Sequence, residues 1–149
     1  MKEYGKIAPV EKTLSLKASP ARAFAHFTEN MGAWWPLGSH SLSRAQAKTV
    51  VFEAKKGGRI YEIDVTGRER EWGHVKECEA PHRLVFSWVL ENVAEATEVE
   101  VTFEDDGKGA TDFKLVHRGW LETKSGAERR EMYAGGWTPV LDDYVSSLA

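Results

Sequence analysis

The stretch EMYAGGWTPVLDDYV, residues 131–145, combines the pattern of a buried helix with residues that weaken helices. Its apolar and aromatic side chains recur at intervals of three and four, which places them on one helical stripe. Gly135 and Gly136 interrupt this stripe, and each glycine costs about 1 kcal/mol relative to alanine inside a helix. Pro139 has no amide hydrogen, and its ring clashes with the preceding helical turn. So large an aromatic stripe needs a surface to cover.

An alternating pattern from residue 49 to residue 117 supplies that surface. In TEVEVTF, residues 97–103, Val99, Val101 and Phe103 alternate with polar residues, which is typical of a half-buried strand. Short turns join consecutive segments, so these strands must pair antiparallel. With one earlier strand included, the pattern predicts strands at residues 10–17, 49–54, 59–65, 72–79, 83–90, 97–103 and 110–117.

Helix signals flank the strands. Ser19 is a good N-cap and Pro20 suits the first helical position, so ASPARAFAHFTEN predicts a helix after the first strand. The segment MGAWWPLGS predicts a second short helix or turn that stops at Pro36. Residues 37–47 are small and polar and predict a loop. The long C-terminal helix should begin at about Ala127.

These elements predict an α+β fold in one domain spanning residues 1–149. A curved antiparallel sheet wraps around the long C-terminal helix, and two short helices follow the first strand. The paired glycines would let the helix backbone approach the sheet or bend. Pro139 would reinforce the bend, or Thr138 and Pro139 would restart the helix. Such a bend serves packing alone, or it shapes a pocket between helix and sheet.

The composition bounds the possible partners. A chain of 149 residues suits one domain, and its net charge of −3 argues weakly against nucleic acid or an anionic membrane. The single cysteine, Cys78, excludes an intrachain disulfide. The first residues lack the apolar run of a signal peptide, and we expect no membrane insertion. We therefore expect a cytoplasmic protein.

The one metal-like spacing in the sequence is His74, Cys78 and His82. On a strand, residues four apart are separated by about 13 Å. Zinc ligands must lie about 2.0–2.3 Å from a shared ion, so we predict no metal site. No nucleophile elbow, phosphate-binding loop or dinucleotide fingerprint is present, and we predict no cofactor and no catalytic residues.

Several motifs resemble a known family. They are ASPARAFAHFTE followed by WWP, VVFEAKKGGRIYE, WGHVKECEAPHRLVFSW, and GGWTPVLDDY. The chain resembles the START-like, or SRPBCC, helix-grip superfamily from about Val10 to Leu148. Within it, the chain is similar to a bacterial branch that resembles the C-terminal domain of activators of heat-shock protein 90 ATPase. The resemblance implies a deep hydrophobic cavity between the long helix and the sheet.

The superfamily contains lipid carriers, plant hormone binders, polyketide cyclases and co-chaperone domains, so the fold alone does not choose a function. We predict non-catalytic binding of a hydrophobic or aromatic small molecule, lipids included. One alternative is a chaperone-associated interaction domain, which would connect the chain to the stress response. A weaker alternative is a cyclase-type enzyme, because an enzyme needs converging polar groups and the sequence offers few.

Core packing explains most of the inward-facing aromatic residues, and the resemblance favours a pocket role for some of them. Trp137 should pack between the C-terminal helix and the concave face of the sheet, and Trp34 and Trp35 should close one end. His117 would hold a polar ligand group or simply bond within the interior. The candidate ligand-binding residues are Trp34, Trp35, Tyr61, Trp72, Phe86, Trp88, Val99, Val101, Phe113, His117, Tyr133 and Trp137.

Overall fold

The computed structural model describes residues 6–89 and 96–148. Seven strands form one sheet in the order β1-β7-β6-β5-β4-β3-β2, and every neighbouring pair is antiparallel. The predicted antiparallel sheet is therefore confirmed. Its strands are β1 (Val10–Leu16), β2 (Ala47–Phe52), β3 (Arg59–Asp64), β4 (Glu69–Glu79), β5 (Arg83–Trp88), β6 (Thr97–Asp105) and β7 (Thr111–Arg118).

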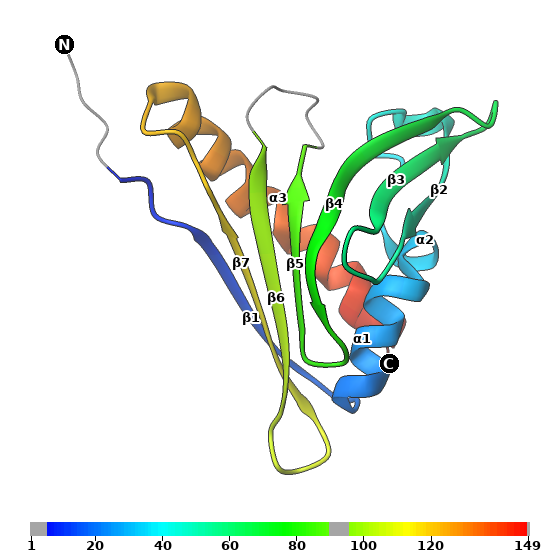
Figure 1. The fold of residues 1–149 in the computed structure, drawn as a ribbon, viewed down its shortest axis with the longest axis vertical. Coiled ribbons are helices and arrows are strands. Elements are labelled where there is room, and N and C mark those ends of the chain that lie inside the picture. Colours follow the sequence, from blue (N-terminus) through cyan, green and yellow to red (C-terminus); the bar gives the residue numbers. More distant parts are fainter. Residues whose placement is uncertain (1–5, 90–95, 149) are drawn as a thin grey trace.

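The helices lie on one side of the sheet. The long helix α3 (Lys124–Leu148) crosses behind the strands, and α1 (Pro20–Glu29) and α2 (Met31–Trp34) cover the end nearer β2 (Figure 1). The predicted cap is present, because the Ser19 side chain accepts a hydrogen bond from the Arg22 amide. Together with a short 3-10 turn, η1 (Arg44–Gln46), these elements form the expected helix-grip α+β fold.

The C-terminal helix differs from the prediction in two ways. It begins at Lys124 rather than near Ala127, and it runs unbroken through Pro139. The predicted alternative that Thr138 and Pro139 restart the helix is therefore wrong. The Thr138 hydroxyl instead accepts a hydrogen bond from Lys12 Nζ at 3.2 Å, which ties the helix to β1. The buried side chains of α3 hold this helix together, because tertiary packing outweighs local propensity.

The expected close approach of the glycines to the sheet is also wrong. No atom lies within 4 Å of where a Cβ would stand on Gly135 or Gly136. Gly135 is exposed, whereas Gly136 is half-buried and borders open space. The absent side chain at Gly136 therefore leaves room beside the helix.

One half of the core is closely packed. Tyr144 of α3 donates a hydrogen bond to the Ala23 carbonyl at 2.7 Å and so ties α3 to α1. Burial of its hydroxyl raises the pKa of Tyr144. Phe27 of α1 is fully buried at this junction. Ring centroids within 6.2 Å of Phe27 belong to Trp34, Phe52, Phe103, Phe113 and Tyr144.

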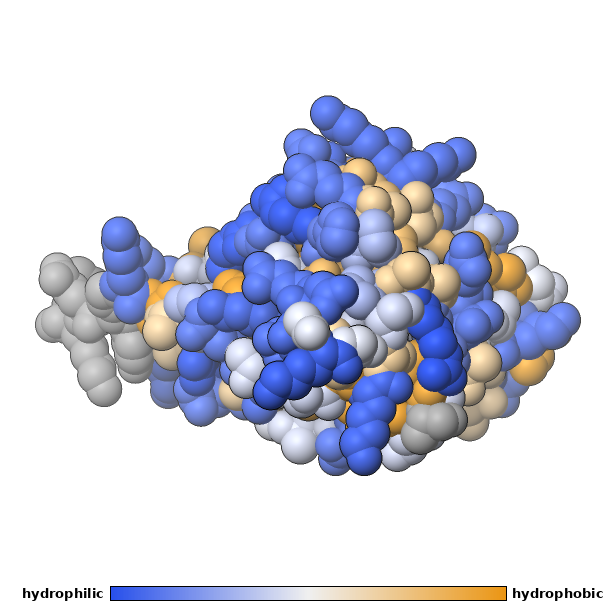
Figure 2. All heavy atoms as spheres, turned by 90° about the horizontal axis from the view of Figure 1, so that it is seen from below, coloured by the Kyte–Doolittle hydropathy of each residue, from blue (hydrophilic) through white to orange (hydrophobic). Residues whose placement is uncertain are grey.

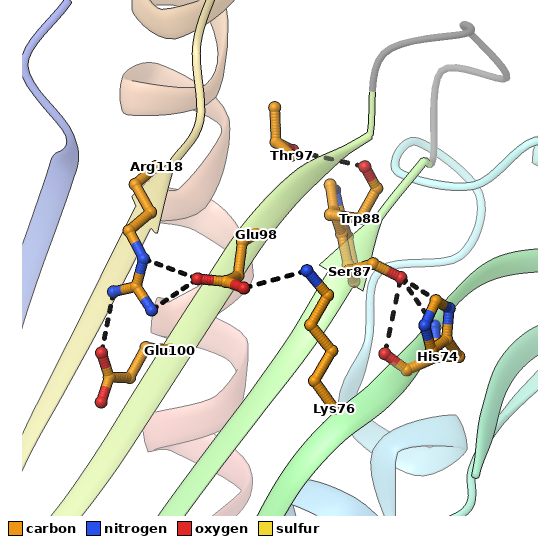
Figure 3. A network of polar contacts seen from close by, with 8 residues as sticks. All are labelled: His74, Lys76, Ser87, Trp88, Thr97, Glu98, Glu100 and Arg118. Atoms are coloured by element: carbon orange, nitrogen blue, oxygen red, sulfur yellow. Dashed lines mark hydrogen bonds and ion pairs between the residues drawn. The ribbon is translucent and has the colours of Figure 1, made fainter. Parts of the chain in front are cut away.

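The outer face of the sheet carries paired charges. Glu98 bonds to both Lys76 at 3.0 Å and Arg118 at 2.6 Å, so three strands are linked (Figure 3). Glu100 accepts from Arg118 at 2.8 Å and from Arg83 at 2.7 Å.

Seen from below, the surface is mainly hydrophilic with hydrophobic patches between the polar side chains (Figure 2). None of the described helices has the length and apolar character needed to cross a membrane.

Candidate ligand-binding pocket

A pocket of about 490 Å³ opens between α3, the end of β5 and the segment that follows α2. This volume falls within the range of small-molecule sites, about 300–1,000 Å³. Its walls are mainly aromatic and aliphatic, and a few polar groups come from one loop. The lining residues are Trp35, Ser39, His40, Ser41, Leu42, Arg44, Trp88, Met132, Tyr133, Gly136, Trp137 and Val140.

Three indole rings form the floor. The ring centroids of Trp88 and Trp137 are 5.6 Å apart, and Trp35 lies 5.8 Å from Trp88 and 5.9 Å from Trp137. All three side chains are buried, so they keep little contact with bulk water. Large, weakly hydrated aromatic surfaces of this kind favour flat hydrophobic molecules.

A buried histidine fixes the orientation of Trp137. The Trp137 indole N–H donates to His117 Nδ1 at 3.0 Å. An indole can only donate, so Nδ1 must be an acceptor, and the hydrogen of the neutral imidazole lies on Nε2. Nε2 then donates to Thr97 Oγ1 at 2.7 Å, and Thr97 donates to the Trp88 carbonyl at 3.3 Å (Figure 3). Both ring nitrogens of His117 are thus engaged behind the pocket wall.

The charge state of His117 agrees with this arrangement. Its side chain is fully buried, and this burial, together with the nearby Arg129 charge, lowers the pKa of His117 to about 3. The imidazole therefore stays neutral at physiological pH. Since its two nitrogens are occupied, His117 supports the floor of the pocket rather than presenting a free polar group to it.

A buried carboxylate attaches the pocket loop to the sheet. Glu62 accepts hydrogen bonds from the amides of Leu42 and Ser43, at 2.6 and 2.8 Å, and from the Trp72 indole at 2.7 Å. Burial alone would raise the pKa of Glu62, but hydrogen bonds from Ser43, Trp72 and Leu42 outweigh it and lower the pKa. The carboxylate therefore stays ionised and holds the loop in place.

Replacing Glu62 by glutamine should loosen this loop. A carboxamide has one acceptor oxygen, so its NH₂ group must face at least one of the three donors whichever way it turns. An unpaired buried donor costs about 1–3 kcal/mol, and we expect the E62Q variant to lose that much stability in urea unfolding. The amides of Leu42 and Ser43 should also exchange hydrogen faster.

The matched control for this change is Glu69→Gln. Glu69 pairs with Arg59 at 3.0 Å on the surface, where water screens the charges and the ion pair contributes little to stability. We expect little loss of stability and unchanged loop exchange in E69Q. Equal behaviour of the two variants would contradict the anchoring role of Glu62.

Local hydrogen bonds shape the rest of the loop. The Trp35 indole donates to the His40 carbonyl at 2.6 Å, which connects the floor to the rim. Ser41 Oγ donates to the Leu37 carbonyl at 2.5 Å and accepts from the Arg44 amide at 2.8 Å. Arg44 has a φ of 51°, in the left-handed region that residues other than glycine seldom occupy.

The family of the chain follows from a comparison with family profiles. The family described as Activator of Hsp90 ATPase homolog 1-like protein matches residues 17–148. The chain belongs to this family. A search of curated protein sequences finds no significant match.

Several solved structures are similar to this chain. An anthrahydroquino-γ-pyrone synthase is 28% identical, with a TM-score of 0.60 over 95% of this chain and 97% of that one. The self-sacrificing resistance protein CalC from Micromonospora echinospora is 27% identical, with a TM-score of 0.72 over 95% of this chain and 94% of that one. An HSP90 activator from Plasmodium falciparum shares the fold at 22% identity, with a TM-score of 0.65 over 92% of this chain and 93% of that one.

The structure brings part of the predicted site of this family member together. Four predicted residues line the pocket: Trp35, Trp88, Tyr133 and Trp137. Tyr61 lies on the other face of β3, beneath the Arg59 guanidinium at 4.1 Å from its ring centre. The remaining seven are buried outside the pocket lining: Trp34, Trp72, Phe86, Val99, Val101, Phe113 and His117.

Sequence reasoning missed one whole wall of the pocket. The polar residues 39–44 carry no periodic signal, so they were expected only to form a loop. Glu62 was detectable in principle, because it alternates with Ile60 on the buried face of a strand. A carboxylate at such a position needs hydrogen-bond donors, and the loop supplies two of them.

The metal-like spacing of the sequence forms no cluster in this structure. Across residues 6–89 and 96–148, no group of three or more histidine, cysteine or acidic side chains is arranged to hold a metal ion. His74 instead bonds to Ser87 Oγ at 3.0 Å on the outer face of the sheet (Figure 3). Burial raises the pKa of the Cys78 thiol.

Proposed function

We propose that the chain is a non-catalytic binding module for a hydrophobic or aromatic small molecule. The observation that carries this proposal is the pocket floor of Trp35, Trp88 and Trp137, beside the space left by Gly136. A flat apolar ligand would fill the space beside these rings and bury the apolar lining. Two solved relatives above 25% identity, a pyrone synthase and a resistance protein, share the fold over nearly their whole length.

The lining supports binding better than catalysis. Among the described lining residues there is one imidazole, His40, and one guanidinium, Arg44, but no carboxylate or thiol. A general acid–base pair or an activated nucleophile needs such a partner within hydrogen-bond reach. We therefore favour the binding module over the cyclase-type enzyme.

Family membership favours one second candidate, a chaperone-associated interaction domain. A docking surface for a protein would need apolar or unpaired charged groups outside the pocket. The charges named on the outer face pair with each other, which leaves them less available to a partner. Calorimetric titration with heat-shock protein 90 tests this candidate separately.

The binding proposal is tested by filling the pocket from Gly136. Replacing Gly136 by leucine should place a side chain in the open space and abolish ligand binding. The same change should stabilise the unliganded helix by roughly 1 kcal/mol, because leucine is a better helix former than glycine. The variant would thus gain stability while losing function, which separates blocked binding from misfolding.

The readout is a thermal-shift screen with flavone, anthraquinone and palmitate, together with native mass spectrometry of the purified protein. A ligand at a hundredfold excess over its dissociation constant should stabilise the wild type by about 2.7 kcal/mol. The matched control is Gly135→Leu, because Gly135 is exposed and absent from the lining. Undiminished binding by G136L, or no binding and no copurified molecule in the wild type, would refute the proposal.

A further inference from the structure

We infer that the ligand of this pocket is an aromatic acid, with its rings on the tryptophan floor and its carboxylate at Arg44. This inference rests on the proposed binding function and narrows it to one chemical class. It follows from the charge of the lining, from the way the loop holds Arg44, and from the engagement of the serine hydroxyls at the rim.

The charge of the lining selects against cations. Arg44 is the only residue with a permanent charge among the described lining residues, and these include no aspartate or glutamate. Within the described chain, Arg44 also has no ion-pair partner. Arg44 is exposed at the edge of an otherwise uncharged lining, so its charge favours an anion over a cation there.

The loop holds Arg44 in a defined place. Its backbone lies in the left-handed region, at a φ of 51°, and its amide donates to Ser41 Oγ. Its guanidinium donates through Nη1 to the Ser39 carbonyl at 2.8 Å. Such backbone strain in a non-glycine residue recurs at ligand clamps. The anchored loop thus keeps this cation at the rim without a bound ligand.

The serine hydroxyls at the rim are already engaged. Ser41 Oγ has both a donor and an acceptor partner, and Ser39 Oγ lies 2.7 Å from His40 Nδ1. The guanidinium has five N–H groups, and the hydrogen bond to Ser39 uses one of them. The remaining fork matches the two oxygens of a carboxylate. Among the described lining residues, Arg44 therefore combines a permanent charge with several unused donors.

A matched pair of probes tests the inference: anthraquinone-2-carboxylate and its neutral carboxamide, titrated into the full chain by calorimetry. The wild type should bind the acid about tenfold more tightly, which corresponds to about 1.4 kcal/mol. Arg44→Gln should weaken binding of the acid to the level of the amide and leave the amide unchanged. The preference of the wild type should shrink at high ionic strength.

Two further variants serve as controls. Arg44→Lys keeps the charge but loses the fork, so part of the preference should remain. Arg59→Gln removes a guanidinium on the far face of β3 and should bind both probes like the wild type. Unchanged affinity for the amide shows that each variant is folded.

The outcomes separate the inference from the function on which it rests. Equal binding of acid and amide by the wild type overturns the inference but leaves the binding function intact. A preference that survives in R44Q does the same. Failure of the wild type to bind either probe overturns the inference, and the Gly136 screen with neutral ligands then decides the function itself.

Discussion

Replacing Trp137 by alanine is expected to lower the free energy of unfolding by about 3–5 kcal/mol, as large-to-small changes of buried aromatic residues do. Trp137 is only 2% exposed and packs on Trp35 and Trp88. Its loss would also leave His117 Nδ1 without a donor. The pocket already borders one side of the ring, so we expect the lower end of this range. Urea denaturation at neutral pH gives the value.

Two variants separate packing from hydrogen bonding at this position. Trp137→Phe keeps a ring but removes the N–H, and an unpaired buried acceptor costs about 1–3 kcal/mol, so its loss should be intermediate. Met132→Ala changes a lining residue that is 54% exposed on the same helix, and its loss should be small. A loss below about 1 kcal/mol for W137A would contradict the structural role of this ring.

Acidification from pH 7.5 to pH 5 is expected to cost about 2 kcal/mol of stability through His117 alone. The folded-state pKa of about 3 lies below the ordinary value of 6.5, so the unfolded chain takes up a proton first as the pH falls. This stability is fully present above pH 6.5 and is lost progressively as the pH falls toward 3. Carboxylates such as Glu62, whose pKa is lowered, contribute to the loss of stability mainly below about pH 4.5. Urea unfolding at several pH values measures the slope.

The slope should flatten in the His117→Gln variant, because glutamine can accept from Trp137 and donate to Thr97 without titrating. His26, whose pKa is lowered by partial burial and by Arg22, adds to the slope in the same direction and should account for the remainder. The matched control is His82→Gln, at an exposed position in the turn after β4. A wild-type slope in H117Q would show that His117 is not the neutral buried group described above.

The hydrogen bonds that stabilise Trp137 and His117 should also favour ligand binding at pH 7, because they hold the whole pocket floor in place. The network from Trp137 through His117 and Thr97 to the Trp88 carbonyl connects α3 with the last residue of β5 and the first of β6. Side chains held by such bonds lose little freedom when a ligand arrives, which lowers the entropic cost of binding. The same hydrogen bonds thus explain the stability losses predicted above, and they keep the side chains of the pocket floor in fixed positions.

The sequence by itself predicted the elements whose signals are local. Alternation along β6 requires only that Val99, Val101 and Phe103 face the same way. The cap at Ser19 acts within one helical turn. Such signals predicted all seven strands, the short helices and the long C-terminal helix. The pocket role of Trp35, Trp88, Tyr133 and Trp137 was instead an expectation from the family resemblance.

Only the tertiary structure decided which side of α3 stays open and what closes the pocket. The helix runs through Pro139 because its buried side chains hold it there, not because its local propensity favours it. The rim is fixed by hydrogen bonds to Glu62 from amides about twenty positions earlier in the chain. Bonds between residues so far apart leave no periodic pattern in a sequence, because their geometry exists only after the sheet and the loop have packed together.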